Sequence, residues 1–301
     1  MSTASRLREL LGRRDKPLVV PGSGTPLEAL AAQSAGFDAV YLSGYAVAAW
    51  RHGLPDIGLL GAEEARDALA AITRVVDIPV ILDADTGYGD ATSVWANVRL
   101  LENAGAAAIQ IEDQVWPKKC GHMEGKVVID ADEAVRKIAS AVAARRDPDT
   151  VIIARTDSLM PLGLDEAIAR GLRFKEAGAD VVFLDAPPSL EALQRIGQSI
   201  PGPLMANMSE GGLTPYLTAD EFHTLGFQLV AFPTTTLRIA AKAMQDFLAE
   251  LRATGDSKPW RGRMHGLDEL NELVDLDSYL TIGDEARTRT IGSRPTEGAL
   301  R

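Results

Sequence analysis

The chain has 301 residues, 46% of them hydrophobic, with a net charge of −11 and one cysteine. This is an ordinary globular composition, and a lone cysteine cannot form an intrachain disulfide, so nothing indicates an oxidising compartment. The acidic balance, without a basic run of five or more residues, argues against nucleic acid or an anionic membrane as the partner. The first residues lack the apolar core of a signal peptide, and no apolar run could span a bilayer, so we expect a cytoplasmic protein.

Short β-rich runs alternate with helical stretches along most of the chain. They cover residues 17–22, 37–44, 79–85, 106–113, 150–157, 180–187, 203–208 and 227–233. The segments between them carry apolar residues at helical spacing and end in glycine or a glycine-containing turn. Continuous apolar strands that alternate with helices are typical of a parallel sheet covered by helices. Eight such units favour a closed (β/α)8 TIM barrel over an open doubly wound sheet, because "GSGTPLEAL" after the first run is no GxGxxG fingerprint.

Two further helices are predicted after the last strand. Residues 233–255 have the pattern of one long helix, and residues 265–280 that of an extra amphipathic helix, which a barrel of eight units does not need. An apolar stripe on this extra helix predicts packing on the chain's own barrel or a contact between subunits; it consists of Leu267, Leu270, Leu273 and Leu276. We therefore expect one barrel domain over residues 1–301, with a helical extension at about 245–285 that takes part in oligomer contacts.

Acidic residues gather where the predicted strands end, which in a TIM barrel is the end that carries the active site. Asp83 and Asp85 stand two apart on an extended segment, so their side chains point to the same side, and Glu112 follows on the next strand. Oxygen ligands without histidine favour Mg²⁺ or Mn²⁺ over zinc. The same acids would also suit helix caps and turns, but three of them at adjacent strand ends favour a metal site.

Polar side chains at the later strand ends would suit a carboxylate substrate. Arg155 ends the fifth strand, where its guanidinium could fork onto a substrate carboxylate or close the acidic mouth as an ion pair. Asn207, Ser209 and Thr214 follow the seventh strand and offer neutral hydrogen bonds. The residues leave both interpretations of Arg155 open.

The single cysteine lies in "VWPKKCGHMEGK", residues 115–126, directly after the fourth strand. Its glycines and lysines predict a mobile loop over the mouth of the barrel. Lys118 and Lys119 would lower the pKa of the Cys120 thiol, and a thiol tuned towards neutrality can protonate a carbanion or attack an electrophile. His122 would position this thiol or bind substrate. The alternative is a surface thiol on a charged loop.

In this order, "DADTGYG", "IEDQ" and "KKCGH" resemble the motifs of the isocitrate lyase and phosphoenolpyruvate mutase superfamily. The similarity extends from "PGSGTPLEAL" to "ELNELVDLDSYL", nearly the whole chain. The resemblance implies a (β/α)8 barrel whose last helix is exchanged between subunits, usually in a homotetramer built from two such dimers. It also implies that Asp85 binds Mg²⁺ directly, while Asp56, Asp83 and Glu112 hold the waters of the metal.

The resemblance further implies a set of residues around the substrate. Cys120 would be the general acid, and the other catalytic residues would be Tyr41, Lys118, His122 and Arg155. Tyr41 is also one candidate for the base that removes the hydroxyl proton. Contacts to the substrate would come from Ser43, Gly44, Gly121, Asp185, Asn207, Ser209 and Thr214.

The implied reaction is carbon–carbon cleavage of a 2-hydroxy di- or tricarboxylate that chelates Mg²⁺. The C2–C3 bond breaks and Cys120 protonates the carbon, which gives a 2-oxo acid such as pyruvate and a saturated carboxylate. Tricarboxylate-cleaving members usually carry a glutamate where this chain has Asp185, and "NMSEGGLTP" looks more like the alkylmalate lyases. We therefore expect a dicarboxylate such as 2,3-dimethylmalate, followed by 2-methylisocitrate.

Other reactions are open on the same fold. Hydrolysis or decarboxylation of oxaloacetate is the main alternative, and phosphonopyruvate-type cleavage of a P–C bond is another, although that reaction does not need Cys120. A non-catalytic binding barrel would be expected to have a degraded metal site. Here the four acids and the cysteine are present together, which favours an enzyme.

Overall fold

The structure is a computed structural model that describes residues 1–121 and 123–292, with side chains described as far as residue 287. His122, for which a catalytic role is expected, therefore lies outside the described residues. The chain forms two compact units, Met1–Lys242 and Ala243–Arg301. None of the helices in the described part combines the length and apolar character that a bilayer span requires.

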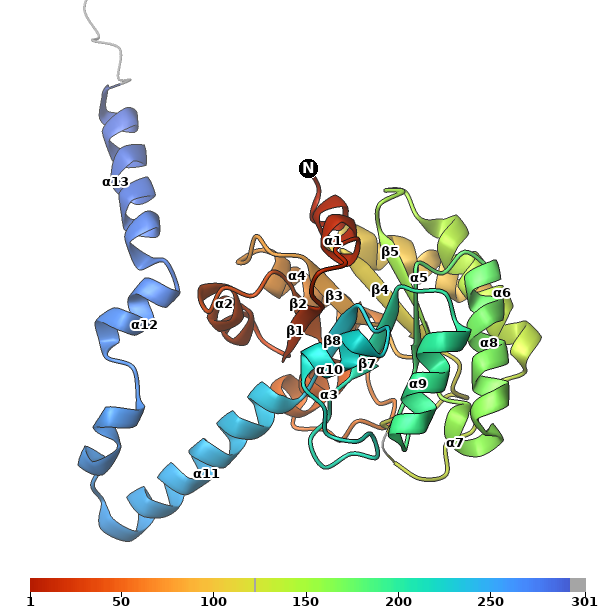
Figure 1. The fold of residues 1–301 in the computed structure, drawn as a ribbon. Coiled ribbons are helices and arrows are strands. Elements are labelled where there is room, and N and C mark those ends of the chain that lie inside the picture. The colour runs from red at the N-terminus through yellow and green to blue at the C-terminus, as the bar shows by residue number, and fades with distance from the viewer. Residues whose placement is uncertain (122, 293–301) are drawn as a thin grey trace, which may run out of the picture. The chain divides into compact units, whose positions relative to one another are not determined.

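The first unit is a closed barrel of eight parallel strands in sequence order, in which the last strand pairs with the first (Figure 1). The strands are β1 (Leu18–Ser23), β2 (Val40–Leu42), β3 (Val80–Asp83), β4 (Ala108–Glu112), β5 (Val151–Thr156), β6 (Val181–Leu184), β7 (Leu204–Asn207) and β8 (Leu229–Phe232). Each predicted β-rich run overlaps one of these strands, so the prediction of a (β/α)8 barrel is confirmed.

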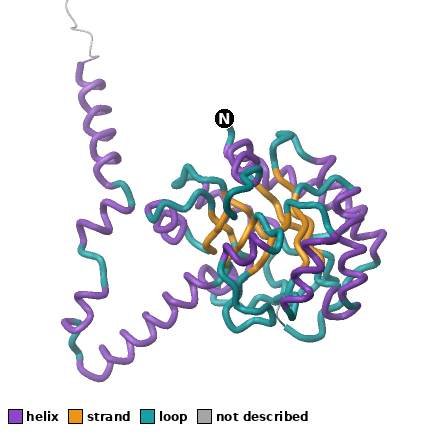
Figure 2. Tube along the Cα trace, in the orientation of Figure 1, coloured by secondary structure: helices purple, strands orange, loops and turns teal. Residues whose placement is uncertain are grey.

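Helices surround the strands of this unit (Figure 2). They are α1 (Thr3–Leu11), α2 (Pro26–Ser34), α3 (Gly44–Ala46), the π-helical turn η1 (Val47–Arg51), α4 (Ala62–Thr73), α5 (Ala91–Asn103), α6 (Ala131–Ala144), α7 (Leu159–Leu162), α8 (Leu164–Glu176), α9 (Leu190–Ser199), α10 (Ala219–Thr224) and the start of α11 (Thr235–Thr254). Side-chain caps define several starts: the Asp90 carboxylate accepts the Ser93 amide at 2.9 Å, and Thr218 and Glu221 form a capping box.

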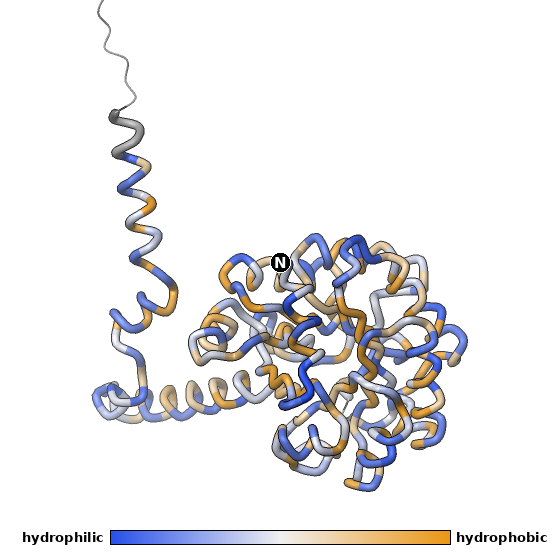
Figure 3. Tube along the Cα trace, turned by 45° about the horizontal axis from the view of Figure 1, so that its top comes forward, coloured by the Kyte–Doolittle hydropathy of each residue, from blue (hydrophilic) through white to orange (hydrophobic). Residues whose placement is uncertain are grey.

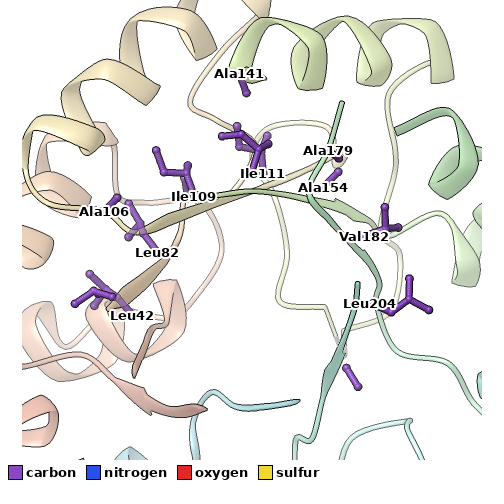
Figure 4. Packing of buried hydrophobic residues seen from close by; sticks show 14 of the residues in the cluster. Leu42, Leu82, Ala106, Ile109, Ile111, Ala141, Ala154, Ala179, Val182 and Leu204 are labelled. Atoms are coloured by element: carbon purple, nitrogen blue, oxygen red, sulfur yellow. The ribbon is translucent and has the colours of Figure 1, made fainter. Parts of the chain in front are cut away.

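Two apolar layers hold the barrel together. Alternate residues of each strand face the helices, as Leu82, Ile109 and Val182 do in Figure 4, and pack in the layer between sheet and helices. The intervening residues fill the barrel interior; Ile81 and Ala108 are examples. This interior packing leaves the ends of the barrel as the places where polar side chains can gather.

Helix α1 closes the end of the barrel at which the strands begin. Its Leu7, Leu10 and Leu11 belong to the interior cluster together with Leu18 and Val151, the first residues of β1 and β5. The opposite end, at the carboxyl ends of the strands, therefore carries the polar residues.

The second unit contains the remainder of α11, the 3₁₀ helix η2 (Lys258–Arg263), α12 (Leu267–Leu273) and α13 (Leu276–Gly292). The long helix predicted at 233–255 is confirmed as α11, along which apolar and polar residues alternate (Figure 3). The single helix predicted at 265–280 is wrong: it is divided into α12 and α13, because Asp275 between them has a φ of 59°. An edge-to-face contact between Phe247 and Trp260 holds α11 against η2, with ring centroids 5.6 Å apart.

We predict that Leu7→Ala lowers the free energy of unfolding by about 2–5 kcal/mol, because the fully buried Leu7 side chain would leave a cavity at the closed end. Chemical denaturation followed by circular dichroism measures this change. Leu27→Ala on α2 is the matched control, since Leu27 is 48% exposed, and should change stability by no more than about 0.5 kcal/mol. Equal effects of the two substitutions would contradict the role given to α1.

Candidate active site

The carboxylates predicted to hold a metal lie at the carboxyl ends of β3 and β4. Asp83 ends β3, Asp85 follows two residues later, and Glu112 ends β4; all three are buried. The Glu112 amide donates to the Asp85 carbonyl at 2.8 Å, which ties the two strand ends together. Asp56 comes from the segment between η1 and α4, and its carboxylate shares the Lys118 ammonium with Asp85.

A tight turn after β3 aims the Asp85 carboxylate. Asp85 has a φ of 47°, in the left-handed region that residues other than glycine rarely adopt. Its amide donates to Asp83 Oδ1 at 3.2 Å, and the same oxygen accepts from Gln110 Nε2 at 3.1 Å. At Gly87, a Cβ atom would lie 2.6 Å from Val94 Cγ2, so the helix that follows leaves no room for a side chain. The turn thus fixes the two aspartates beside each other.

The cation that these acids contact in the structure is Lys118. Its Nζ bonds Asp56 Oδ1 and lies 2.8 Å from Asp85 Oδ1. Among the described residues, no group of three or more His, Cys, Asp or Glu side chains is arranged to enclose a metal ion. Burial raises the pKa of Asp85 to about 7, although the neighbouring Lys118 ammonium acts to lower this pKa. Burial also raises the pKa of Glu112 well above its usual value.

The acid cluster nevertheless contains carboxylate oxygens that could coordinate a hard cation. In the part of the chain that the structure describes, Glu112 Oε1 has no hydrogen-bond partner, whereas Asp85 Oδ1 is held by the Lys118 ammonium at 2.8 Å. Buried carboxylate oxygens without partners are costly, and Mg²⁺ prefers such oxygen donors. We judge that this set of carboxylate oxygens fits Mg²⁺ or Mn²⁺, and that Lys118 would share the carboxylates with it.

Most of the predicted substrate and catalytic residues line one small cavity of about 40 Å³ at this end of the barrel. The lining consists of Tyr41, Ser43, Tyr45, Asp56, Asp83, Lys118, Cys120, Gly121, Arg155, Asp185, Asn207, Ser209, Pro233 and Thr234. Gly44 lines an adjoining cavity together with Asp56, Asp83 and Asp85. Thr214 is buried but lines neither cavity.

Arg155 is the centre of an ion-pair network with Glu112, Asp157 and Asp185, which we call the floor of the cavity. Its Nε and Nη2 bond the two oxygens of Asp157 at 2.8 and 3.0 Å. The same guanidinium lies 3.2 Å from Glu112 and 3.3 Å from Asp185. Of the two interpretations of Arg155, the structure contains the ion pair; a fork onto a substrate carboxylate stays a prediction.

Tyr41 lies on the inner face of β2, with its side chain buried. Burial raises the pKa of the Tyr41 hydroxyl well above its ordinary value, and the nearby Asp83 carboxylate raises it further. At neutral pH the phenol therefore keeps its proton and can donate a hydrogen bond. This favours Tyr41 as a donor to a substrate oxygen over its use as a base.

The chain matches the phosphoenolpyruvate phosphomutase family over residues 7–252. It belongs to the phosphoenolpyruvate mutase and isocitrate lyase superfamily. It is 44% identical over 282 residues to the 2,3-dimethylmalate lyase of Eubacterium barkeri, covering 94% of this chain and 97% of that protein. It is 45% identical over 273 residues to the 2-methylisocitrate lyase of Aeropyrum pernix, covering 91% and 87%. The membership of this superfamily that the sequence motifs predicted is confirmed.

Solved structures of the superfamily have the same fold. A crystal structure of 2,3-dimethylmalate lyase matches with a TM-score of 0.90 and 36% identity over 100% of this chain and 99% of that one. A structure of oxaloacetate acetylhydrolase with 3,3-difluorooxalacetate matches with a TM-score of 0.89 and 33% identity over 95% and 97%. The superfamily fold thus accounts for the whole arrangement of strands that positions the site.

In this superfamily member, hydrogen bonds hold the segment on both sides of the thiol. The Gln114 side chain exchanges two hydrogen bonds with the backbone of Lys119, at 2.9 and 3.0 Å. Lys119 Nζ in turn donates to the carbonyls of Glu124 and Gly125. Cys120 is half-buried in between and lines the cavity. A lowered pKa of this thiol stays a prediction.

Sequence reasoning missed two charged residues of the site. Asp157 bonds Arg155 from two positions further along, and it lies at the strand end in "ARTD", where acids were expected to converge. Lys126 closes the quoted segment "VWPKKCGHMEGK", and its buried ammonium bonds Asp157 and Asp185. Its position six residues from Cys120 was visible in the sequence, but the direction of its side chain was not.

We predict that Asp85→Asn weakens Mg²⁺ binding by roughly 100-fold, because it removes the charge of the acid that the family resemblance implies is the direct ligand. Isothermal titration calorimetry with MgCl₂ measures the affinity. Asp38→Asn is the matched control, because Asp38 forms only exposed ion pairs and should leave the affinity unchanged. Wild-type affinity in Asp85→Asn would refute this assignment.

Proposed function

We propose that this protein is a Mg²⁺-dependent carbon–carbon lyase that cleaves a 2-hydroxy dicarboxylate into a 2-oxo acid, such as pyruvate, and a saturated carboxylate. One observation carries the proposal: the only thiol of the chain and two of the acids assigned to the metal site line the same small cavity. A proton donor and an oxygen-rich cation site on one cavity are what such a cleavage needs. The two lyases named above, which are similar over most of this chain, support it.

We assign Asp85 as the direct ligand of the metal, and Asp56, Asp83 and Glu112 as the residues that hold its waters. When bound, Mg²⁺ acts as a Lewis acid that makes the substrate hydroxyl more acidic. The strained turn at Asp85 and the hydrogen bonds to Asp83 keep these carboxylates in place before a substrate arrives.

The side chains around the cavity would then bind and orient the substrate. The substrate hydroxyl would lose its proton to a base of the site as its oxygen becomes the 2-oxo group. Tyr41 and Arg155 would donate to oxygens that gain negative charge as the C2–C3 bond breaks and its electron pair moves to the C3 carboxylate. Cys120 gives its proton to C3 and becomes a thiolate. Asn207 and Ser209, on the wall formed by β7 and the segment after it, would hold the second carboxylate. His122, outside the described residues, keeps its expected role beside the thiol.

The cavity favours a dicarboxylate over a tricarboxylate. The Asp185 carboxylate is held at 3.3 Å by both Arg155 and Lys126, so those two cations are engaged with protein carboxylates. Within the described ranges, a third carboxylate of a substrate would meet no cation beside Asp185 that is not already paired with a protein carboxylate. The identities of 44% and 45% do not separate the two lyase activities, so the geometry supports the smaller 2,3-dimethylmalate type.

Hydrolysis of oxaloacetate is the second candidate reaction. The similarity to oxaloacetate acetylhydrolase, with a TM-score of 0.89, favours it among the alternatives on this fold. Cleavage of a P–C bond is supported by lower similarity, 31% identity to phosphonopyruvate hydrolase. Both reactions use a small oxo acid in place of a hydroxy acid, so a substrate panel separates them from the lyase.

We also infer a homotetramer built from helix-exchanged dimers. The C-terminal unit leaves large apolar side chains exposed, among them Leu267 at 82%, Tyr279 at 67% and Ile282 at 65%. Large apolar side chains exposed in number on one small helical unit support a role of this unit in protein contacts. A cytoplasmic location accords with the single cysteine, whose proposed role needs a reduced thiol.

The first test is release of 2-oxo acid from a panel of malate, alkylmalates, isocitrate, 2-methylisocitrate and oxaloacetate, each with Mg²⁺ and with a chelator. We expect pyruvate from 2,3-dimethylmalate in the presence of Mg²⁺ and none with the chelator. Turnover of oxaloacetate or phosphonopyruvate with no reaction of any hydroxy acid would replace the lyase by one of the alternatives.

We predict that Cys120→Ser reduces turnover by at least about 100-fold and leaves the affinity for Mg²⁺ unchanged, because a serine hydroxyl is a far weaker acid than a thiol. Product formation and calorimetric titration of Mg²⁺ measure the two quantities separately. Equal loss of metal binding would show that the cysteine supports the site structurally, and full turnover would exclude it as the acid.

A further inference from the structure

Lys126 is among the most deeply buried charged groups at the carboxyl end of the barrel. Its side chain is 1% exposed, and it comes from the segment after β4 rather than from a strand. The ammonium donates to Asp157 Oδ1 at 2.9 Å and to Asp185 Oδ2 at 3.3 Å. Its third acceptor is the backbone carbonyl of Gly121, at 2.5 Å. All three donor hydrogens of the ammonium are therefore used.

The charge balance of the floor explains why an ammonium is needed there. Glu112, Asp157 and Asp185 are buried side by side, and the guanidinium that all three contact is that of Arg155. Buried carboxylates need a paired cation, so Lys126 is drawn to this position by its two acids. The bond to Gly121 links that ion pair to the residue next to Cys120.

The backbone at Gly121 rests directly on the same ion pairs. A Cβ atom at this position would lie 2.1 Å from Asp185 Oδ2 and 2.5 Å from Arg155 Nη2. Glycine is therefore required, and its carbonyl accepts a hydrogen bond from the Lys126 ammonium, which also bonds Asp185 Oδ2. The position of the peptide after Cys120 thus depends on the floor of the cavity through two separate contacts.

Lys126 is not among the residues that line the cavity. We propose that Lys126 is a positioning residue, which fixes the Gly121 carbonyl against the Asp157 and Asp185 carboxylates and so sets where the Cys120 thiol lies. The proposal rests on the proposed function, because it is the acid of that reaction that Lys126 positions. Displacement of a reacting group by about 1 Å can cost roughly 100-fold in rate.

The test is Lys126→Met, read out by the alkylation rate of Cys120 with iodoacetamide and by kcat and KM for the hydroxy acid. Because the chain has one cysteine, the incorporated label reports this thiol alone. We expect alkylation about tenfold faster than in the wild type, because the half-buried thiol is no longer held. We expect kcat to fall by roughly 100-fold and KM to change by less than about threefold.

Lys175→Met is the matched control, since Lys175 is a half-buried lysine that bonds the Asp180 carbonyl at 3.0 Å, at the end of α8. It should leave both the alkylation rate and kcat at wild-type values. Wild-type alkylation and kcat in Lys126→Met would overturn the proposal. So would equal changes in the two methionine variants, which would indicate general destabilisation.

A double variant guards against a Lys126→Met protein that fails to fold with an unpaired buried carboxylate. Lys126→Met with Asp185→Asn removes one charge of each sign, so the buried charge balance is kept while the bond to Gly121 is lost. Fast alkylation in the folded double variant supports the proposal, and wild-type alkylation overturns it. The alkylation readout needs no turnover. If the protein cleaves no hydroxy acid, the proposed function is refuted, but the alkylation rates still show whether Lys126 sets the position of the thiol.

Discussion

The pairing of buried charges at the carboxyl end of the barrel is the constraint on which the rest of the site depends. Glu112, Asp157 and Asp185 are each at most 3% exposed, and they stay together because Arg155 and Lys126 lie among them. Removing one partner of such a cluster leaves a charge in a medium that solvates it poorly. The eight strands supply a rigid frame for the acids, and the cations then decide which arrangement of them is stable.

Two of the three cations come from one segment between β4 and α6, and that segment also carries the thiol. Lys118 bonds the acids assigned to the metal, and Lys126 bonds the acids of the floor. Cys120 lies between the two lysines in the chain, so charge pairing on both sides of it determines its place. The same interactions that neutralise the acids therefore bring the proposed proton donor to the cavity. Chemistry and electrostatic stability are coupled here through one short segment.

The barrel could be predicted because its strands are continuous apolar runs bounded by glycine and proline, a pattern that depends only on local sequence. Asp83, Asp85 and Glu112 could be placed together because the carboxyl ends of neighbouring parallel strands must meet. The position of the Lys126 side chain could not be predicted. A long side chain from an irregular segment can point to water or to a buried acid, and only the three-dimensional charge balance selects between the two. The break at Asp275 was missed for a related reason: a single left-handed residue interrupts a helix without disturbing its apolar spacing.

The excess of acid over base in the site bears on how an anionic substrate could enter it. Asp56, Asp83, Asp85 and Glu112 face Lys118 on one side of the cavity, and burial already raises the pKa of Asp85 to about 7. A dicarboxylate brought into this field would be repelled unless further positive charge were present. The Lys126 ammonium is engaged with Asp157 and Asp185, and the Arg155 guanidinium is already shared among three protein carboxylates, so the two cations do not offset the acids on their own. A divalent cation on the carboxylate oxygens of Asp85 and Glu112 would reverse the local sign, so the proposed metal would assist substrate binding as well as bond cleavage.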